Sequence, residues 1–166
     1  MKRELKFTLK AWPVITITTL GICVLTQLVA EGFGIELKEQ QNIALVRKMF
    51  VHALDGWRNF GAAALNISLI LAIMPALEEF VFRYLLFRLP AGKTAGMRHW
   101  TVLTVSSAIF SSAHYVMQPF PDNAFVALAW FGAMQCLLYS KTGSLKYAVL
   151  NHSLFNLTSL CLLPLV

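Results

Sequence analysis

Long apolar runs alternate with short polar segments along the whole chain. The runs cover residues 11–30, 60–88, 100–117, 124–139 and 145–166. A helix of about twenty apolar residues crosses the ~30 Å hydrocarbon core of a bilayer, so these runs predict transmembrane helices, the fourth of them short. We therefore expect an all-α fold, a polytopic transmembrane helix bundle of about five spans that forms a single domain over residues 1–166.

The polar segment between the first two runs has a pattern of its own. One helical stripe there carries the apolar side chains of Ile43, Val46, Phe50, Ala53 and Trp57, and the charged residues lie outside the stripe. This spacing predicts a short amphipathic helix at the membrane surface. A helix that faces the aqueous side and packs on the spans fits the same pattern.

Composition supports the membrane interpretation. Hydrophobic residues make up 57% of the chain and charged residues only 13%, which excludes an ordinary soluble domain. The net charge of +6 comes mostly from residues in the segments between the runs, so lipid and topology explain it better than nucleic acid. The cysteines Cys23, Cys136 and Cys161 lie in apolar runs without metal-ligand spacing, and we interpret them as packing residues.

The charge pattern also predicts an orientation. The N-terminal tail and the turns at 88–98 and 141–146 are basic, whereas the segments at 31–58 and 118–123 are balanced or acidic. Because basic loops stay in the cytoplasm, this alternation predicts a cytoplasmic N-terminus and a C-terminus outside. The first run is longer than the ~7–15 apolar residues of a signal peptide, so we expect an uncleaved span.

Three ionisable residues interrupt the second run. Glu78, Glu79 and Arg83 lie within six residues of each other, and an ionisable group at bilayer depth costs at least ~2.5 kcal/mol. On a helix Glu79 and Arg83 share a face and are expected to pair. Glu78 points about 100° away and needs a partner on another segment or on water, as a general base does. Pro75 removes a backbone donor and frees a carbonyl group that needs polar company.

Three more polar residues lie in later runs. His114 is near the end of the third, and His152 and Asn156 are four apart on one face of the fifth. Counted from the basic turns at about 1.5 Å per residue, they reach a common level with Glu78. Each has a structural interpretation as a hydrogen-bonded contact between helices. The site hypothesis depends on their convergence from three spans.

These residues resemble a known family. Glu78, Glu79 and Arg83 match its EExxxR motif, Phe110 and His114 match FxxxH, and His152 and Asn156 match HxxxN. The motifs are those of the CAAX protease and bacteriocin-processing family, which includes the type II CAAX prenyl endopeptidases. The resemblance covers about residues 67–160. Tyr84 departs from the pattern, because members commonly have glycine after the arginine.

The resemblance implies an intramembrane glutamic endopeptidase without a cofactor. Glu78 would activate a water that His114 also holds, and His152 and Asn156 would stabilise the oxyanion. Glu79, Arg83 and Phe110 would support them. The expected partners are membrane lipid and a membrane-associated peptide or protein substrate, with no nucleic acid. The short chain is similar to prokaryotic members, which implies the inner or plasma membrane of a prokaryotic cell.

Three alternatives use the same residues. His114, His152 and Glu78 form a chemically sensible zinc ligand set with an open fourth position, although the chain contains no HExxH motif. A transporter or proton relay also uses intramembrane Glu and His, but internal pseudo-symmetry is not seen in the sequence. A non-catalytic immunity or binding protein would retain the architecture without the reaction.

Overall fold

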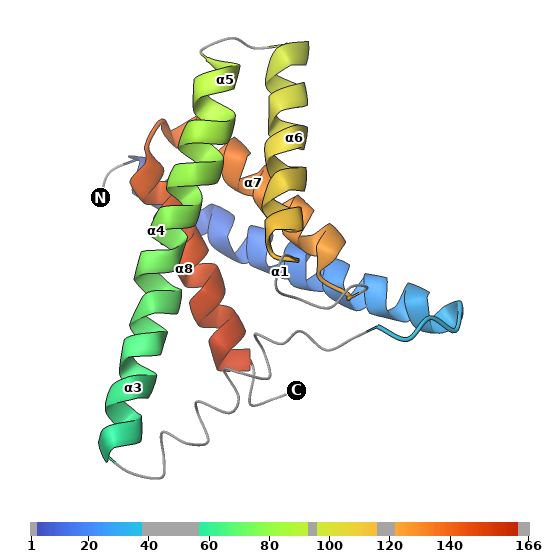
Figure 1. The fold of residues 1–166 in the computed structure, drawn as a ribbon. Coiled ribbons are helices and arrows are strands. Elements are labelled where there is room, and N and C mark those ends of the chain that lie inside the picture. The colour runs from blue at the N-terminus through green and yellow to red at the C-terminus, as the bar shows by residue number, and fades with distance from the viewer. Residues whose placement is uncertain (1–2, 38–56, 93–95, 116–121, 163–166) are drawn as a thin grey trace.

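The computed structural model describes residues 3–37, 57–92, 96–115 and 122–162 of the chain. Every regular element in these ranges is a helix, so the all-α prediction is confirmed for the described part. The predicted amphipathic surface helix lies almost wholly in residues 38–56, outside the described residues. Figure 1 shows the arrangement of the helices and the labels used below.

The first helix, α1 (Arg3–Gly32), contains the whole first apolar run. Four of its threonines, Thr8, Thr18, Thr19 and Thr26, pair their hydroxyls internally, because each bonds to a carbonyl of the preceding turn. Thr19, for example, donates from Oγ1 to the Ile15 carbonyl at 2.7 Å. α1 packs against α7 (Phe125–Thr142) and α8 (Leu145–Leu162). The Trp130 indole of α7 also donates to Thr18 Oγ1 at 3.0 Å.

The second run forms one long continuous helix with two π-helical stretches (Figure 1). Its consecutive parts are α3 (Trp57–Ser68), η1 (Leu69–Ile73), α4 (Met74–Glu79), η2 (Phe80–Arg88) and α5 (Leu89–Ala91). A π turn uses i→i+5 hydrogen bonds, and such turns are frequent at functional sites. The two acidic residues therefore lie on a short α-helical part between two π-helical parts.

Pro75 explains a polar contact across the bundle. In η1 the Met74 N–H bonds to the Leu69 carbonyl, five residues back. The next bond of this kind would join Pro75 to Ile70, and proline has no N–H. The Ile70 carbonyl instead accepts a hydrogen bond of 3.0 Å from Asn156 Nδ2 on α8. The prediction that a carbonyl group freed by Pro75 needs a polar partner is confirmed. The partner is Asn156, one of the candidate site residues.

The remaining helices are α6 (Met97–Ala113), α7 and α8. α6 and α7 are joined at their near ends by Ser111 Oγ, which donates to the Phe125 carbonyl at 2.6 Å. α7 ends at Gly143, whose left-handed φ of 65° lets its N–H return to the Tyr139 carbonyl. Because α8 begins two residues later, α7 and α8 form a tight helical hairpin.

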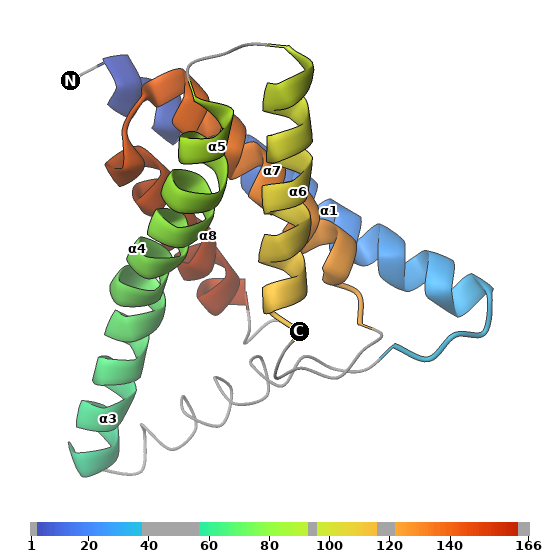
Figure 2. The same ribbon diagram turned by 45° about the horizontal axis from the view of Figure 1, so that its top comes forward.

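The helix ends separate into two groups. Figure 2 shows the first turn of α1, the end of α5, the start of α6 and the α7–α8 turn at one end of the bundle. The last turns of α1, α6 and α8 and the start of α3 lie at the other end. The described parts of the basic segments thus share one end, and the orientation itself remains a prediction.

Two described helices are long and apolar enough to cross a membrane, Arg3–Gly32 and Gly61–Ala91. Only 22% and 11% of their most apolar windows are buried inside the bundle, whereas the core helix of a soluble protein would be mostly buried. Their exposed apolar surface therefore fits contact with lipid. The five-span count is not confirmed by this criterion and remains a prediction.

Close packing of α6 against α7 depends on Gly132, and this gives a first testable prediction. A Cβ atom at position 132 would lie 3.2 Å from Ser107 Cα and 3.3 Å from a ring carbon of Phe110. Gly132→Ala should destabilise the fold by about 1–3 kcal/mol, because backbone cannot yield as a flexible side chain does. Thermal unfolding in detergent measures this change. Gly21→Ala is the matched control, since nothing lies within 4 Å of the added Cβ; equal unfolding temperatures for the two variants would contradict the prediction.

Candidate active site

The foundation of the site is a buried ion pair at the α4–η2 boundary. Arg83 Nε lies 3.1 Å from Glu79 Oε2, and both side chains are fully buried. The guanidinium also stacks on Phe110, with its carbon 4.5 Å from the ring centroid. The predicted pairing of Glu79 with Arg83 is therefore confirmed, and the phenylalanine of the second motif contacts it.

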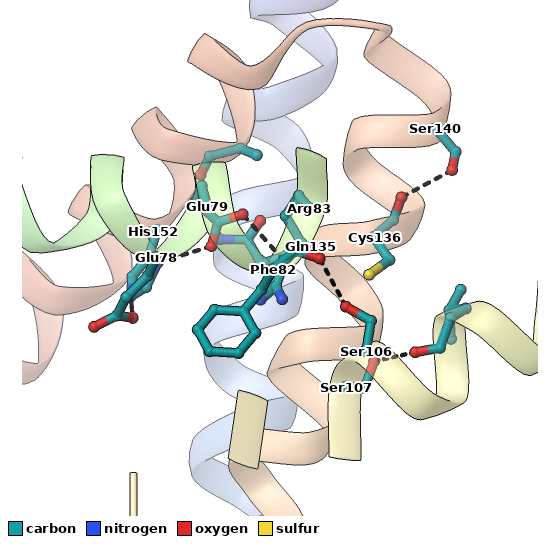
Figure 3. A network of polar contacts seen from close by, with 12 residues as sticks. Glu78, Glu79, Phe82, Arg83, Ser106, Ser107, Gln135, Cys136, Ser140 and His152 are labelled. Atoms are coloured by element: carbon teal, nitrogen blue, oxygen red, sulfur yellow. Dashed lines mark hydrogen bonds and ion pairs between the residues drawn. The ribbon is translucent and has the colours of Figure 1, made fainter. Parts of the chain in front are cut away.

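Glu79 connects this pair to α8. Its other oxygen, Oε1, lies 2.9 Å from His152 Nδ1, and Figure 3 shows Glu79 between Arg83 and His152. Because a carboxylate paired with Arg83 accepts hydrogen bonds only, Nδ1 is the donor in this contact. The contact fixes the orientation of the His152 ring, so that Nε2 faces away from Glu79. A carboxylate that bonds to one ring nitrogen of a catalytic histidine orients the other nitrogen in the same way.

Nε2 of His152 faces Glu78, the other acid of the adjacent pair. Glu78 Oε2 lies 3.7 Å from His152 Nε2 and 3.9 Å from His114 Nε2. The Glu78 side chain is 20% exposed, in contrast to the fully buried Glu79. Adjacent acids therefore have different environments, and Glu78 finds its neighbours on two other helices, as predicted.

His114 is held by its own helix. It caps the C-terminus of α6, and its Nδ1 lies 2.8 Å from the Phe110 carbonyl. A carbonyl only accepts hydrogen bonds, so Nδ1 donates and the neutral ring carries its lone pair on Nε2. His114 and His152 thus present the same ring nitrogen to the same oxygen of Glu78.

The three groups at this point are all hydrogen-bond acceptors when Glu78 is ionised and the rings are neutral. Such a cluster is stabilised by a hydrogen donor or a cation between its members. Two acceptors that share the hydrogens of one water, at about 2.8 Å each, lie roughly 4.4 Å apart. The observed distances of 3.7 and 3.9 Å are somewhat shorter than this. The geometry therefore suits a small polar species that all three groups contact.

Asn156 lies one helical turn beyond His152 on α8. One hydrogen of its amide is used by the Ile70 carbonyl, and the Nδ2 group carries a second hydrogen. The structure thus brings Glu78, His114 and His152 together, and Asn156, one turn further along α8, is bonded to the Ile70 carbonyl. Their catalytic roles remain predictions.

Aromatic rings cover the buried side of the site. Phe110 is fully buried and lies 4.6 Å from the His114 ring and 6.2 Å from the His152 ring, measured between centroids. Phe131 on α7 meets the His152 ring edge-on at 5.0 Å. Phe110 therefore contacts both histidine rings, and Phe131 contacts the His152 ring.

Further polar residues beneath the site were not singled out by the sequence as site residues. Ser106 Oγ on α6 donates to the Phe82 carbonyl at 2.7 Å, and so fixes α6 to the π-helical stretch η2 (Figure 3). Gln135 on α7 is fully buried, and its Nε2 donates to the Ala148 carbonyl at 3.3 Å. In the sequence, the only signal for Ser106 and Gln135 was that a polar residue stands in an apolar run. Such a signal does not identify the group to which the residue bonds.

A metal ion at this site would need at least three protein ligands in a suitable arrangement. Within residues 3–37, 57–92, 96–115 and 122–162, no group of three or more His, Cys, Asp or Glu side chains is arranged to hold a metal ion.

Apolar helices that gather a carboxylate and two imidazoles at depth define a functional site in a membrane-embedded protein. Comparison with models of protein families identifies the family to which this protein belongs. A family model described as "Type II CAAX prenyl endopeptidase Rce1-like" matches residues 60–158, which are 99 of the 166 residues. The chain belongs to this family. It is therefore an integral membrane protein, a CAAX-type endopeptidase in the general sense, whose substrate is a peptide or protein in the membrane.

Comparison with curated proteins and with solved structures finds no match. The matched residues include all three motifs identified in the sequence, from Glu78 to Asn156.

Proposed function

We propose that the chain hydrolyses a peptide bond in a membrane-associated peptide or protein by means of a water molecule that Glu78 activates. The observation that carries this proposal is the convergence of His114 Nε2 and His152 Nε2, from two helices, on Glu78 Oε2 at 3.9 and 3.7 Å. A water in that position donates one hydrogen to the carboxylate and the other to an imidazole. Its oxygen lone pairs are then free to attack a carbonyl carbon.

The reaction balances with the residues present. Glu78 takes a proton as the water oxygen bonds to the scissile carbonyl carbon, which gives a tetrahedral oxyanion. The protonated acid then gives this proton to the leaving nitrogen as the C–N bond breaks. His114 holds the water, because its Nδ1 is committed to the Phe110 carbonyl and only Nε2 faces Glu78.

His152 and Asn156 stabilise the oxyanion in this proposal. Asn156 offers the second hydrogen of an amide that Ile70 already orients. His152 donates from Nε2, so both of its ring nitrogens carry hydrogen in this role, with Nδ1 bonded to the Glu79 carboxylate. Loss of one oxyanion donor typically costs about 2.7–4 kcal/mol of transition-state stabilisation.

The topology that fits this function has five spans, with the N-terminus in the cytoplasm and the C-terminus outside. The grouping of the basic segments at one end of the bundle supports it (Figure 2). Lipid surrounds the apolar helix faces, and the cell envelope is that of a prokaryote. A reporter fused at the C-terminus that is active only in the cytoplasm would contradict this topology.

Mass spectrometry of peptides incubated with the purified chain in liposomes tests the proposed activity. The panel contains a prenylated CAAX peptide, the same peptide without the prenyl group, and a peptide with a hydrophobic leader. In ¹⁸O-labelled water a hydrolase places one ¹⁸O atom in the new carboxyl group of the product. Cleavage with this label supports the proposal. Absence of any cut peptide for wild type under conditions where it is folded would favour a non-catalytic binding or immunity role.

A zinc-dependent variant of the reaction is the alternative that the residue types allow, although no group of three or more His, Cys, Asp or Glu side chains among the described residues is arranged to hold a metal ion. Tetrahedral zinc ligands with bonds of ~2.0–2.1 Å lie roughly 3.3 Å apart, and the observed distances fall between this value and that for water. We expect cleavage to be unchanged after dialysis against a strong chelator. Loss of activity that added Zn²⁺ restores would assign a metal role to Glu78, His114 and His152 instead.

A further inference from the structure

A separate cavity lies between the helices at the end that carries the basic turns. Its volume is about 580 Å³. Its lining consists of Phe87, Arg88, Gly92, Gly96, His99, Trp100, Leu137, Tyr139, Ser140, Lys141 and Gly143. None of the candidate catalytic residues lines it. The end of α5, the start of α6 and the α7–α8 turn, which contribute or adjoin lining residues, lie at the same end of the bundle in Figure 2.

The lining has a one-sided charge. Arg88, Lys141 and His99 come from three different helices, and no residue among the eleven that line the cavity is acidic. The first turn of α6 adds backbone N–H groups, since its N-cap is Gly96 and no side chain caps it. The positive end of the α6 dipole thus points towards the same space as the basic side chains. The cavity is suited to an anion.

Aromatic groups give the cavity a fixed wall. His99 meets Phe87 edge-on at 5.2 Å and Trp100 at 5.8 Å, measured between ring centroids, so the imidazole is held at the wall. Phe87 is buried, whereas Trp100 is 56% exposed. A tryptophan that is partly exposed beside basic residues is typical of the headgroup level of a bilayer.

Exposed apolar side chains adjoin the lining residues in sequence. Leu89 follows Arg88 and Met97 follows Gly96, and these two side chains are 57% and 86% exposed. A free inorganic anion makes no use of such exposed apolar side chains. A phospholipid does, because its phosphate enters the basic cavity while its acyl chains lie along the exposed helix faces.

We propose that this cavity binds the headgroup of an anionic phospholipid from the leaflet at the basic end of the bundle. Arg88 and Lys141 pair with the phosphate, the α6 N-terminus donates hydrogen bonds to it, and Trp100 packs at the glycerol level. The site is independent of the proposed peptidase chemistry, so it stands or fails separately from the function proposed above.

Native mass spectrometry of the full chain in detergent tests the lipid site. Phosphatidylglycerol and phosphatidylcholine with identical acyl chains are titrated in parallel. We expect wild type to retain phosphatidylglycerol preferentially, and Arg88→Gln/Lys141→Gln to bind it about tenfold or more weakly. Equal binding of both lipids by wild type, or unchanged phosphatidylglycerol binding by the double variant, would overturn the proposal.

The matched control is Arg98→Gln/Lys146→Gln. It also removes two positive charges near this end of the bundle, but from residues that do not line the cavity. The affinity of this variant for phosphatidylglycerol should equal that of wild type. If the Arg88 variant fails to fold, Lys141→Gln alone gives the same comparison, because Lys141 is exposed. Inorganic phosphate serves as competitor; displacement of the lipid at equimolar phosphate would assign the cavity to a free anion and reject the lipid.

Discussion

Glu78→Gln should abolish most peptide cleavage and leave the fold intact. The amide has nearly the shape of the carboxylate but cannot take a proton from water, and a general base typically contributes about 10²–10⁴-fold to the rate. The fold should survive, because Glu78 is partly exposed and takes no part in the buried Glu79–Arg83 pair. Cleavage rates by quantitative mass spectrometry and thermal unfolding in detergent give the two measurements.

Two further variants make the Glu78 result specific. Glu31→Gln changes an exposed carboxylate on α1 that accepts a hydrogen bond from Gln27, and it should cleave as wild type does. Glu78→Asp keeps the charge but moves it away from the two histidines, so an intermediate rate is expected. Normal turnover by a folded Glu78→Gln protein would exclude Glu78 as the base, whatever the behaviour of the other variants.

Contacts within one helix were predictable from the sequence. Glu79 and Arg83 are four residues apart, so their pairing needs only a helical turn and a dry environment. The requirement for a partner of Glu78 on another segment followed in the same way, because Glu78 points away from Glu79. The motif spacing then identified His114 and His152 as the groups to expect beside it.

Contacts between helices were less accessible to sequence reasoning. The bond from His152 to Glu79 depends on the rotation of α8 against α4, which no local period fixes. The π-helical stretches η1 and η2 change the rotation of the long helix on either side of the acids, and the sequence signal for them is only Pro75. For the same reason the Ile70 carbonyl, a backbone group, was not predicted as the partner of Asn156.

The two basic turns illustrate a similar limit. Their charge predicted which end of the bundle they share, since loop charge acts through topology. It did not predict that Arg88 and Lys141, 53 positions apart, line one cavity. That juxtaposition arises because the end of α5 and the α7–α8 turn lie at the same end of the bundle.

Arg83→Met should produce the largest loss of stability among the variants considered. It removes one partner of a fully buried ion pair and leaves the Glu79 charge with only the hydrogen bond from His152. Breaking a buried pair from one side typically costs about 3–5 kcal/mol. The guanidinium also packs on Phe110, so part of the loss comes from that contact. Reversible unfolding by denaturant in detergent measures the change.

The double variant Glu79→Gln/Arg83→Met separates charge from packing. It has no unpaired buried charge, so it should regain a large part of the stability that Arg83→Met loses, whereas Arg98→Met, at an exposed position, should change little. Because the Glu79→Gln change removes the carboxylate that His152 contacts, the stable double variant should still cleave poorly. A double variant as unstable as Arg83→Met would show that the pair acts through packing and not through charge. Full activity in it would show that the Glu79 carboxylate is not needed to orient His152.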